Sequence, residues 1–162
     1  NIHASAFATD ETKHHHIEAF KKELDNITAA NNWFIAGGDL NTLPPNSDST
    51  DYCFEDICSG ESFHHAGDDP LHKEGSNYTP ESTWLTDFYS DYQSAVGLNL
   101  YYQNQPAYFT HTTRPERTWD RTLDYLFTNH HWRTGSTIVH QDFFFDSDHA
   151  PVSAEFVLVK NK

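Results

Sequence analysis

The chain has 162 residues and a mass of 18.6 kDa, which suits one domain with a hydrophobic core. Its aromatic content of 15% argues against disorder, and no stretch approaches the roughly 18 apolar residues that span a bilayer. With 24 acidic and 10 basic residues, the formal net charge is -14, which argues against a passive nucleic-acid binder. An enzyme that handles phosphates through a bound cation is compatible with this charge, because the cation supplies local positive charge.

Taken in chain order, the pattern of apolar residues predicts helices between strands and then mostly strands. Residues 1–7 predict a strand, and a helix capped by Thr9 or Asp10 should run to about Ile27, with apolar residues at helical spacing on one face. Residues 33–36 predict a short strand that ends at two glycines. Further expected elements are a weak helix over 80–96 and strands over 108–112, 123–128, 137–140 and 152–159. This order indicates an α/β or α+β arrangement of layers.

The segment 44–80 is polar, acidic and rich in turn residues, and a connection of this length is usually functional or covers another surface. Cys53 and Cys58 could form a small disulfide loop or stay as two buried thiols. Together with the acidic, lysine-poor composition they favour a secreted or periplasmic origin. Ligand-type residues also crowd this segment, but their spacing matches no metal site we can name, so a solvated loop is preferred: His64, His65, Asp68, Asp69 and His72.

Three stretches place polar residues directly at or within an apolar strand. The first is WFIAGGDLNT, in which Asp39 and Asn41 follow a buried-looking strand and, two residues apart, point to the same side. The second is WDRTLDYLFTN, in which Asp124 interrupts a strand-like run. A charge there costs free energy unless it is paired or bound to a cation. The alternative interpretations are a turn or cap role for Asp39 and a buried pair of Asp124 with Arg117 or Arg121.

The third stretch is FFFDSDHAPVSAEFVLV, in which Asp148 and His149 interrupt an aromatic strand. A carboxylate beside an imidazole packs poorly in a core, but it suits a metal ligand next to a general base. With His3, the three stretches make an inventory for metal-assisted hydrolysis of a phosphate ester.

The motifs GGDLNT, RTLDYLFTN, SDHAPV and the opening NIH, found in this order, resemble the endonuclease/exonuclease/phosphatase superfamily. The resemblance implies an α/β fold: the C-terminal half of a four-layer α/β sandwich of the deoxyribonuclease I-like type. That half has a mixed, mostly antiparallel sheet with flanking helices. It also implies that residues 1–162 form a single, N-terminally incomplete domain.

The resemblance implies a role for each matched residue. Asp39 would contact the metal or activate the attacking water, and Asn41 would orient water or phosphate. His149 would act as general base or acid, with Asp124 holding its tautomer. Asp148 would be a metal ligand or an outer carboxylate. The ligand types, oxygen and imidazole without thiolate, favour Mg²⁺ or Mn²⁺ as the cofactor.

His3 would donate a hydrogen bond to a phosphoryl oxygen as charge builds up in the transition state. The glutamate that holds the metal in this superfamily belongs to the N-terminal half, and none of Glu11, Glu18 or Glu23 fits its motif. Two hypotheses follow. One is a metal-dependent phosphoesterase acting on a nucleic acid, a phospholipid or a small phosphate ester. The other is a non-catalytic half-domain that needs a separate N-terminal half or self-association.

Overall fold

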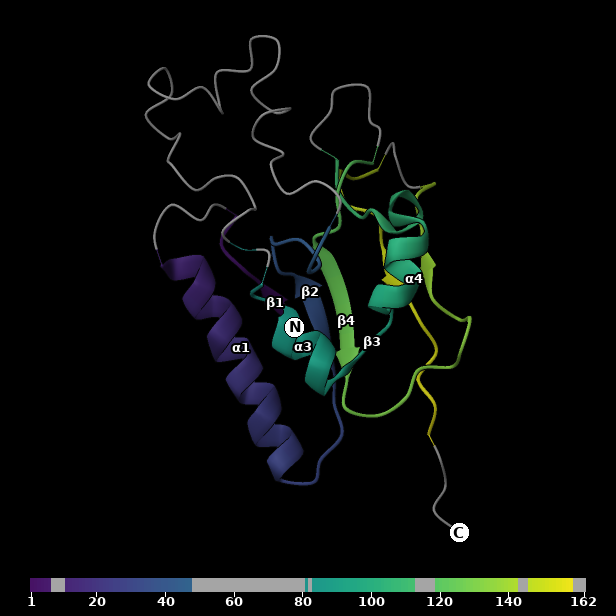
Figure 1. Ribbon diagram of the computed structural model, residues 1–162. Coiled ribbons are helices and arrows are strands. Elements are labelled where there is room, and N and C mark those ends of the chain that lie inside the picture. Colours follow the sequence, from purple (N-terminus) through teal and green to yellow (C-terminus); the bar gives the residue numbers. More distant parts are fainter. Residues whose placement is uncertain (7–10, 48–80, 82, 113–118, 143–145, 159–162) are drawn as a thin grey trace.

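The computed structural model describes residues 1–6, 11–47, 81, 83–112, 119–142 and 146–158 (Figure 1). Helices alternate with strands along the chain, and four of the strands form one mixed sheet. The expected mixture of helices and strands is therefore confirmed. The elements in chain order are β1 (Ile2–His3), α1 (Thr12–Ala29), β2 (Ile35–Asp39), α3 (Thr86–Asp91), β3 (Gln93–Ser94), α4 (Leu98–Gln103), the 3₁₀ turn η3 (Gln105–Tyr108), β4 (Asp124–Thr128), β5 (Ile138–Val139) and β6 (Val152–Ser153). No helix in these ranges is both long and apolar enough to cross a membrane.

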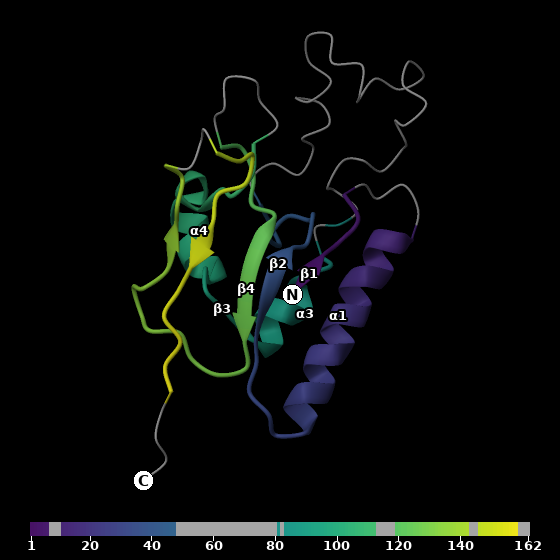
Figure 2. The same cartoon turned by 180° about the vertical axis from the view of Figure 1, so that it is seen from behind.

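The main sheet has the strand order β1-β2-β4-β3. β1 runs parallel to β2, while β4 runs antiparallel to both β2 and β3, so two of the three pairings are antiparallel. β5 and β6 form a second, antiparallel pair. Both views show this pair on the side of β4 opposite to α1 (Figures 1 and 2).

Two glycines allow the central strand to lie between its neighbours. A Cβ on Gly37 would be 1.9 Å from the carbonyl oxygen of Tyr125, and one on Gly38 would be 1.9 Å from that of Ile2. Gly38 also has φ +138°, which side-chain-bearing residues rarely adopt. The sequence predicts that the strand ends at these glycines, but β2 continues through them to Asp39, because their backbone pairs with β4.

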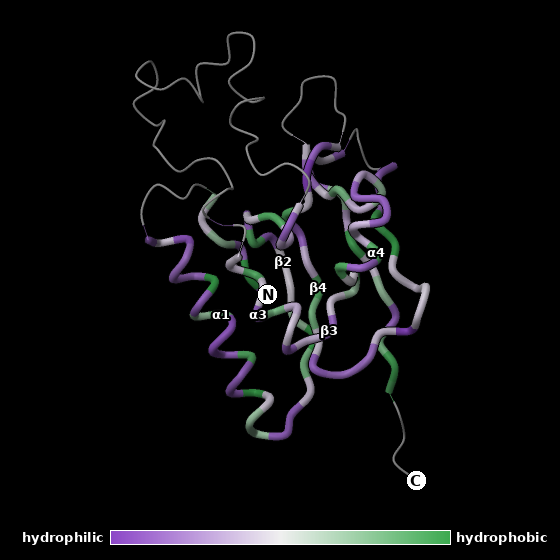
Figure 3. Tube along the Cα trace, in the orientation of Figure 1, coloured by the Kyte–Doolittle hydropathy of each residue, from purple (hydrophilic) through white to green (hydrophobic). Residues whose placement is uncertain are grey.

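The core lies between the main sheet and the helices α1 and α3. The predicted apolar face of α1 is confirmed: Ile17 and Leu24 are each 2% exposed, and they pack with aromatic residues of α3 and β4 such as Phe88 and Phe127. Figure 3 shows hydrophilic and hydrophobic residues alternating along α1. The helix begins after Glu11, which makes no side-chain capping bond, and the expected caps Thr9 and Asp10 lie outside the described residues.

A buried ion pair connects the start of α1 to the rest of the fold. Lys13 Nζ lies 2.6 Å from Glu81 Oε2, and the two side chains are 0% and 1% exposed. Lys13 Nζ also donates to the carbonyl oxygen of Ala6, which follows β1. Burial lowers the pKa of Lys13 and raises that of Glu81, and their mutual attraction opposes both changes. Lys13 therefore ties the start of α1 both to Glu81 and to the chain that leaves β1.

Several predicted boundaries are wrong. Residues 108–112 do not form a continuous strand, because Tyr108 belongs to the 3₁₀ turn η3 and His111 alone in this range makes β-bridges, to Arg121 and His149. The expected helix over 80–96 is limited to α3, since Gln93–Ser94 pairs with β4 instead. The last strand is shorter than expected, because only Val152–Ser153 pairs with β5. Residues 48–80, with both cysteines and the histidine-rich loop, lie outside the described residues.

Candidate functional site

The register of the main sheet places three polar side chains in one row. His3 pairs with Asp39 across β1 and β2, and Asp39 pairs with Asp124 across β2 and β4. Residues directly opposite one another in a sheet point to the same face, so the three side chains share a face at one end of the strands. His3 Nε2 lies 3.5 Å from Asp39 Oδ2, and the side chains of His3, Asp39 and Asp124 are 78%, 13% and 22% exposed.

His149 reaches this row from the segment before β6. Its Nδ1 lies 2.8 Å from Asp124 Oδ2, and its Nε2 lies 3.8 Å from Asp39 Oδ2. The hydrogen bond with Asp124 raises the pKa of His149 and outweighs the opposing effect of burial. The structure thus brings together the histidine and both strand carboxylates that the sequence motifs single out.

Asn41 holds the Asp39 carboxylate in place. It has φ 52°, and its backbone N–H donates to Asp39 Oδ1 at 2.8 Å. Its side-chain amide donates to Asp39 Oδ2 and to the carbonyl oxygen of Ala4, both at 3.0 Å. The amide hydrogens therefore position Asp39 against the end of β1, whereas the resemblance implies that Asn41 orients water or phosphate.

Opposing electrostatic effects act on the pKa of the Asp39 carboxylate. Burial raises its pKa and the nearby Asp124 raises it further, while the N–H of Asn41 and the imidazoles of His149 and His3 act in the opposite direction. Two carboxylates face each other across β2 and β4 at this point. A cation or a proton near them would relieve their repulsion.

Thr110 positions Asp124, a role that the sequence motifs did not predict. Its Oγ1 accepts the backbone N–H groups of Leu123 and Asp124, each at 3.0 Å. A threonine outside every motif carries no local signal of such a role. Asp124 does not pair with Arg121, since Arg121 Nε donates instead to Asp120 Oδ1 at 2.7 Å, and Arg117 lies outside the described residues.

Asp148 lies beside two histidines. One ligand atom from each of His111, Asp148 and His149 can be chosen so that all three lie within 4.8 Å of one another. Asp148 is exposed, and His111 is a half-buried residue whose pKa burial lowers to about 4. The resemblance implies that Asp39 and Asp148 are both metal ligands, but the cluster that forms around Asp148 contains histidines and does not include Asp39.

A hollow of about 380 Å³ opens beside the row of polar side chains. Asp124 and His149 line it together with Gly38 of β2 and with Leu126, Pro151 and other neighbouring residues. A small ligand in this hollow would therefore contact the histidine–carboxylate pair directly.

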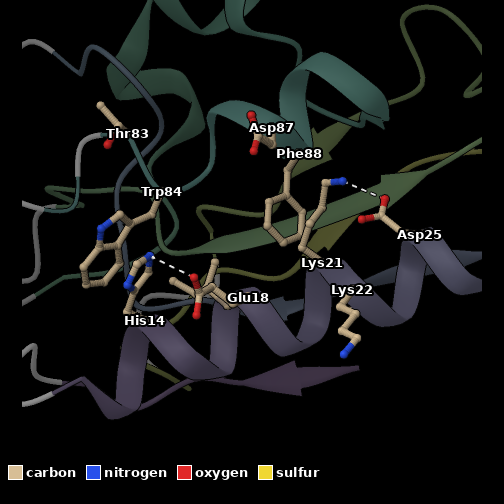
Figure 4. A pocket seen from close by; sticks show the side chains of 10 residues that line it. His14, Glu18, Lys21, Lys22, Asp25, Thr83, Trp84, Asp87 and Phe88 are labelled. Carbon is tan, nitrogen blue, oxygen red and sulfur yellow. Dashed lines mark hydrogen bonds and ion pairs between the residues drawn. The ribbon is translucent and has the colours of Figure 1, made fainter.

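A second hollow, of about 350 Å³, lies between α1 and the α3 region (Figure 4). There His14 stacks on Trp84 with ring centroids 4.5 Å apart, and Lys21 Nζ lies 2.7 Å from Asp25 Oδ1. Figure 4 shows His14 turned toward Glu18 and Lys21 turned toward Asp25. Lys21 and Asp25 neutralise each other there, whereas a hydrogen-bonded histidine–carboxylate pair lines the first hollow, which is therefore the better candidate for chemistry.

No protein-family model matches the sequence, and no curated protein is significantly similar to it. The motifs and the geometry of the site are therefore the basis on which a function can be assigned to this chain.

Proposed function

We propose that this chain carries the catalytic histidine and carboxylates of a divalent-metal-dependent phosphoesterase, which hydrolyses a phosphodiester or phosphomonoester by in-line attack of water. The observation that carries the proposal is the 2.8 Å contact between His149 and Asp124, beside the Asp39 carboxylate and next to a hollow. The same proposal includes the finer fold: the C-terminal half of a four-layer, deoxyribonuclease I-like sandwich.

His149 has the arrangement of a general base or acid. The Asp124 carboxylate accepts the Nδ1–H of His149, which leaves the Nε2 lone pair to accept a proton. This Nε2 is on the side of Asp39. In its neutral form His149 would take the proton of the attacking water, and in its charged form it would protonate the leaving oxygen.

The Asp39 carboxylate would hold Mg²⁺ or Mn²⁺, while Asp148, the second ligand that the resemblance implies, lies in the cluster with His111 and His149. Carboxylate oxygens are the ligands these ions prefer. Burial and, after it, the neighbouring Asp124 raise the pKa of Asp39, and a cation would stabilise its charged form. When bound, the ion would polarise a phosphoryl oxygen and stabilise charge in the transition state. Asn41 keeps the Asp39 oxygens in a fixed orientation through two hydrogen bonds.

His3 would contact the substrate. Its imidazole is largely exposed and its Nε2 lies 3.5 Å from Asp39 Oδ2, so its ring is directed to the same row as His149. As an imidazolium or as a neutral N–H donor, it would stabilise an oxygen on which negative charge builds up.

Hydrolysis of p-nitrophenyl phosphate and bis-p-nitrophenyl phosphate with Mg²⁺ or Mn²⁺ tests the proposal. His149→Ala should lower the rate by about 10²–10⁴-fold, the usual contribution of a general base or acid. His131→Ala is the matched control, because His131 is an exposed histidine beyond the opposite end of β4 and should leave the rate unchanged. Turnover that survives His149→Ala, or no turnover of either ester, would refute the proposal. The second result would favour the non-catalytic alternative.

A further inference from the structure

Two short segments hold His111, Asp148 and His149 against each other. His111 forms a β-bridge with His149, and their ring centroids are 4.5 Å apart. The Thr112 N–H donates to the carbonyl oxygen of Asp148, and the Ala150 N–H donates to that of Thr110. Backbone contacts on both sides of the cluster therefore fix the spacing of its three side chains.

The imidazoles of His111 and His149 each have a ring nitrogen that could bind a ligand, but for different reasons. The Nδ1 of His111 is buried and has no hydrogen-bond partner within the described part of the chain. A buried polar atom without a partner costs free energy, and a bound ligand can satisfy it. The Nδ1 of His149 is already held by Asp124, which leaves its Nε2 for a ligand. A carboxylate behind a ligating histidine is a common arrangement in metal sites, where it fixes the ring and makes the ligand more basic.

We propose that His111, Asp148 and His149 form a binding site for a transition-metal ion of borderline softness, represented by Zn²⁺. Their ligand atoms lie within 4.8 Å of one another, and this is the one group of three such residues among those that the structure describes. Two imidazoles and one carboxylate suit Zn²⁺, Ni²⁺ or Cu²⁺ better than Mg²⁺, which prefers oxygen ligands. The site is therefore distinct in chemistry from the Mg²⁺ or Mn²⁺ position assigned to Asp39.

Zinc at this site would inhibit hydrolysis. A metal on His149 Nε2 occupies the lone pair that the general base needs, so the two states of His149 exclude each other. This consequence depends on the proposed function, whereas the binding of the metal does not.

Isothermal titration of the purified chain with Zn²⁺, in the presence of excess Mg²⁺, tests the site. The chain has 12 histidines, so the informative quantity is the change in zinc stoichiometry between variants. His111→Phe and Asp148→Asn should each lose one equivalent, or bind that equivalent at least about tenfold more weakly. Asp148 is exposed, so Asp148→Asn keeps the fold even if His111→Phe does not. His131→Gln is the matched control and should keep the full stoichiometry.

Nitrogen NMR of the histidine rings gives a local measurement. Zinc should shift the ring signals of His111 and His149, and these shifts should disappear in Asp148→Asn. Unchanged zinc stoichiometry and affinity in both cluster variants would overturn the proposal, and so would an equal loss in His131→Gln.

Inhibition separates this proposal from the proposed function. If zinc binds at the cluster and inhibits ester hydrolysis, the half-inhibitory concentration should rise at least about tenfold in Asp148→Asn. Zinc that binds at the cluster without inhibiting would support the metal site and contradict the role of His149 as general base. Zinc binding lost in both cluster variants supports the site even in a chain that hydrolyses neither ester.

Discussion

Replacing Lys13 by methionine should lower the free energy of unfolding by about 3–5 kcal/mol, because it leaves a buried carboxylate without its partner. Lys13 and Glu81 are 0% and 1% exposed and are joined by a 2.6 Å contact. The other carboxylate oxygen, Glu81 Oε1, makes no hydrogen bond of good geometry in the described ranges, so Lys13 and, more weakly, the Thr42 hydroxyl stabilise the buried carboxylate. Because domains are stable by only about 5–15 kcal/mol, this is a large fraction of the total.

The solvent exposure of the two side chains, and not the distance between them, determines the cost of breaking an ion pair. Arg133 and Glu155 are joined by a similar contact of 2.8 Å, but their side chains are 67% and 60% exposed. Arg133→Met should therefore cost less than about 1 kcal/mol. The double variant Lys13→Met with Glu81→Leu should recover most of the stability lost in Lys13→Met, since no unpaired charge stays buried.

The cost of Lys13→Met should also depend on pH. Burial already raises the pKa of Glu81, and the variant removes the ammonium group that lowers it. An acid with a raised pKa in the folded state stabilises the fold below its unfolded pKa, and this stability is lost as the pH rises through the folded pKa. The deficit should thus be smaller near about pH 5 than near about pH 8.

Urea unfolding, followed by tryptophan fluorescence at both pH values, measures this deficit. A cost below about 1 kcal/mol, or a cost that is the same at both pH values, would refute the reasoning.

Three further outcomes are expected. Asp124 raises the pKa of His149, so kcat/KM for ester hydrolysis should rise with pH through a value above 6.5. Asp124→Asn should move this rise to lower pH, and a pH profile of kcat/KM that is the same in the variant would contradict the pairing. Thr110→Val leaves two backbone N–H groups at the start of β4 without an acceptor and should cost about 1–3 kcal/mol for each group that stays buried, measured by chemical unfolding. Gly38→Ala would place a methyl group 1.9 Å from the Ile2 carbonyl oxygen, so it should displace β1 and lower the melting temperature. Amide hydrogen exchange in β1 should become faster, and an unchanged exchange rate would count against the close approach.

The sequence by itself determined the features that depend on local pattern. Ile17 and Leu24 recur at the helical period, and this period alone locates α1 and its buried face. Asp39 and Asp124 stand out because a charge at or inside an apolar strand needs a partner, whatever that partner is. His149 stands out for the same reason, since an imidazole beside a carboxylate interrupts an aromatic run.

The tertiary structure decided which of these residues meet. The row of His3, Asp39 and Asp124 depends on strand register, which in turn depends on the close approach allowed by Gly37 and Gly38. Register is a property of paired strands, so no single segment encodes it.

The same reason explains the contacts that the sequence did not predict. The hydrogen bonds of Thr110, the burial of Lys13 with Glu81 and the place of His111 beside His149 all join segments that are distant along the chain. Local pattern reports which side chains need a partner. Only the packing of the sheet, the helices and the connecting segments determines which partner each one finds.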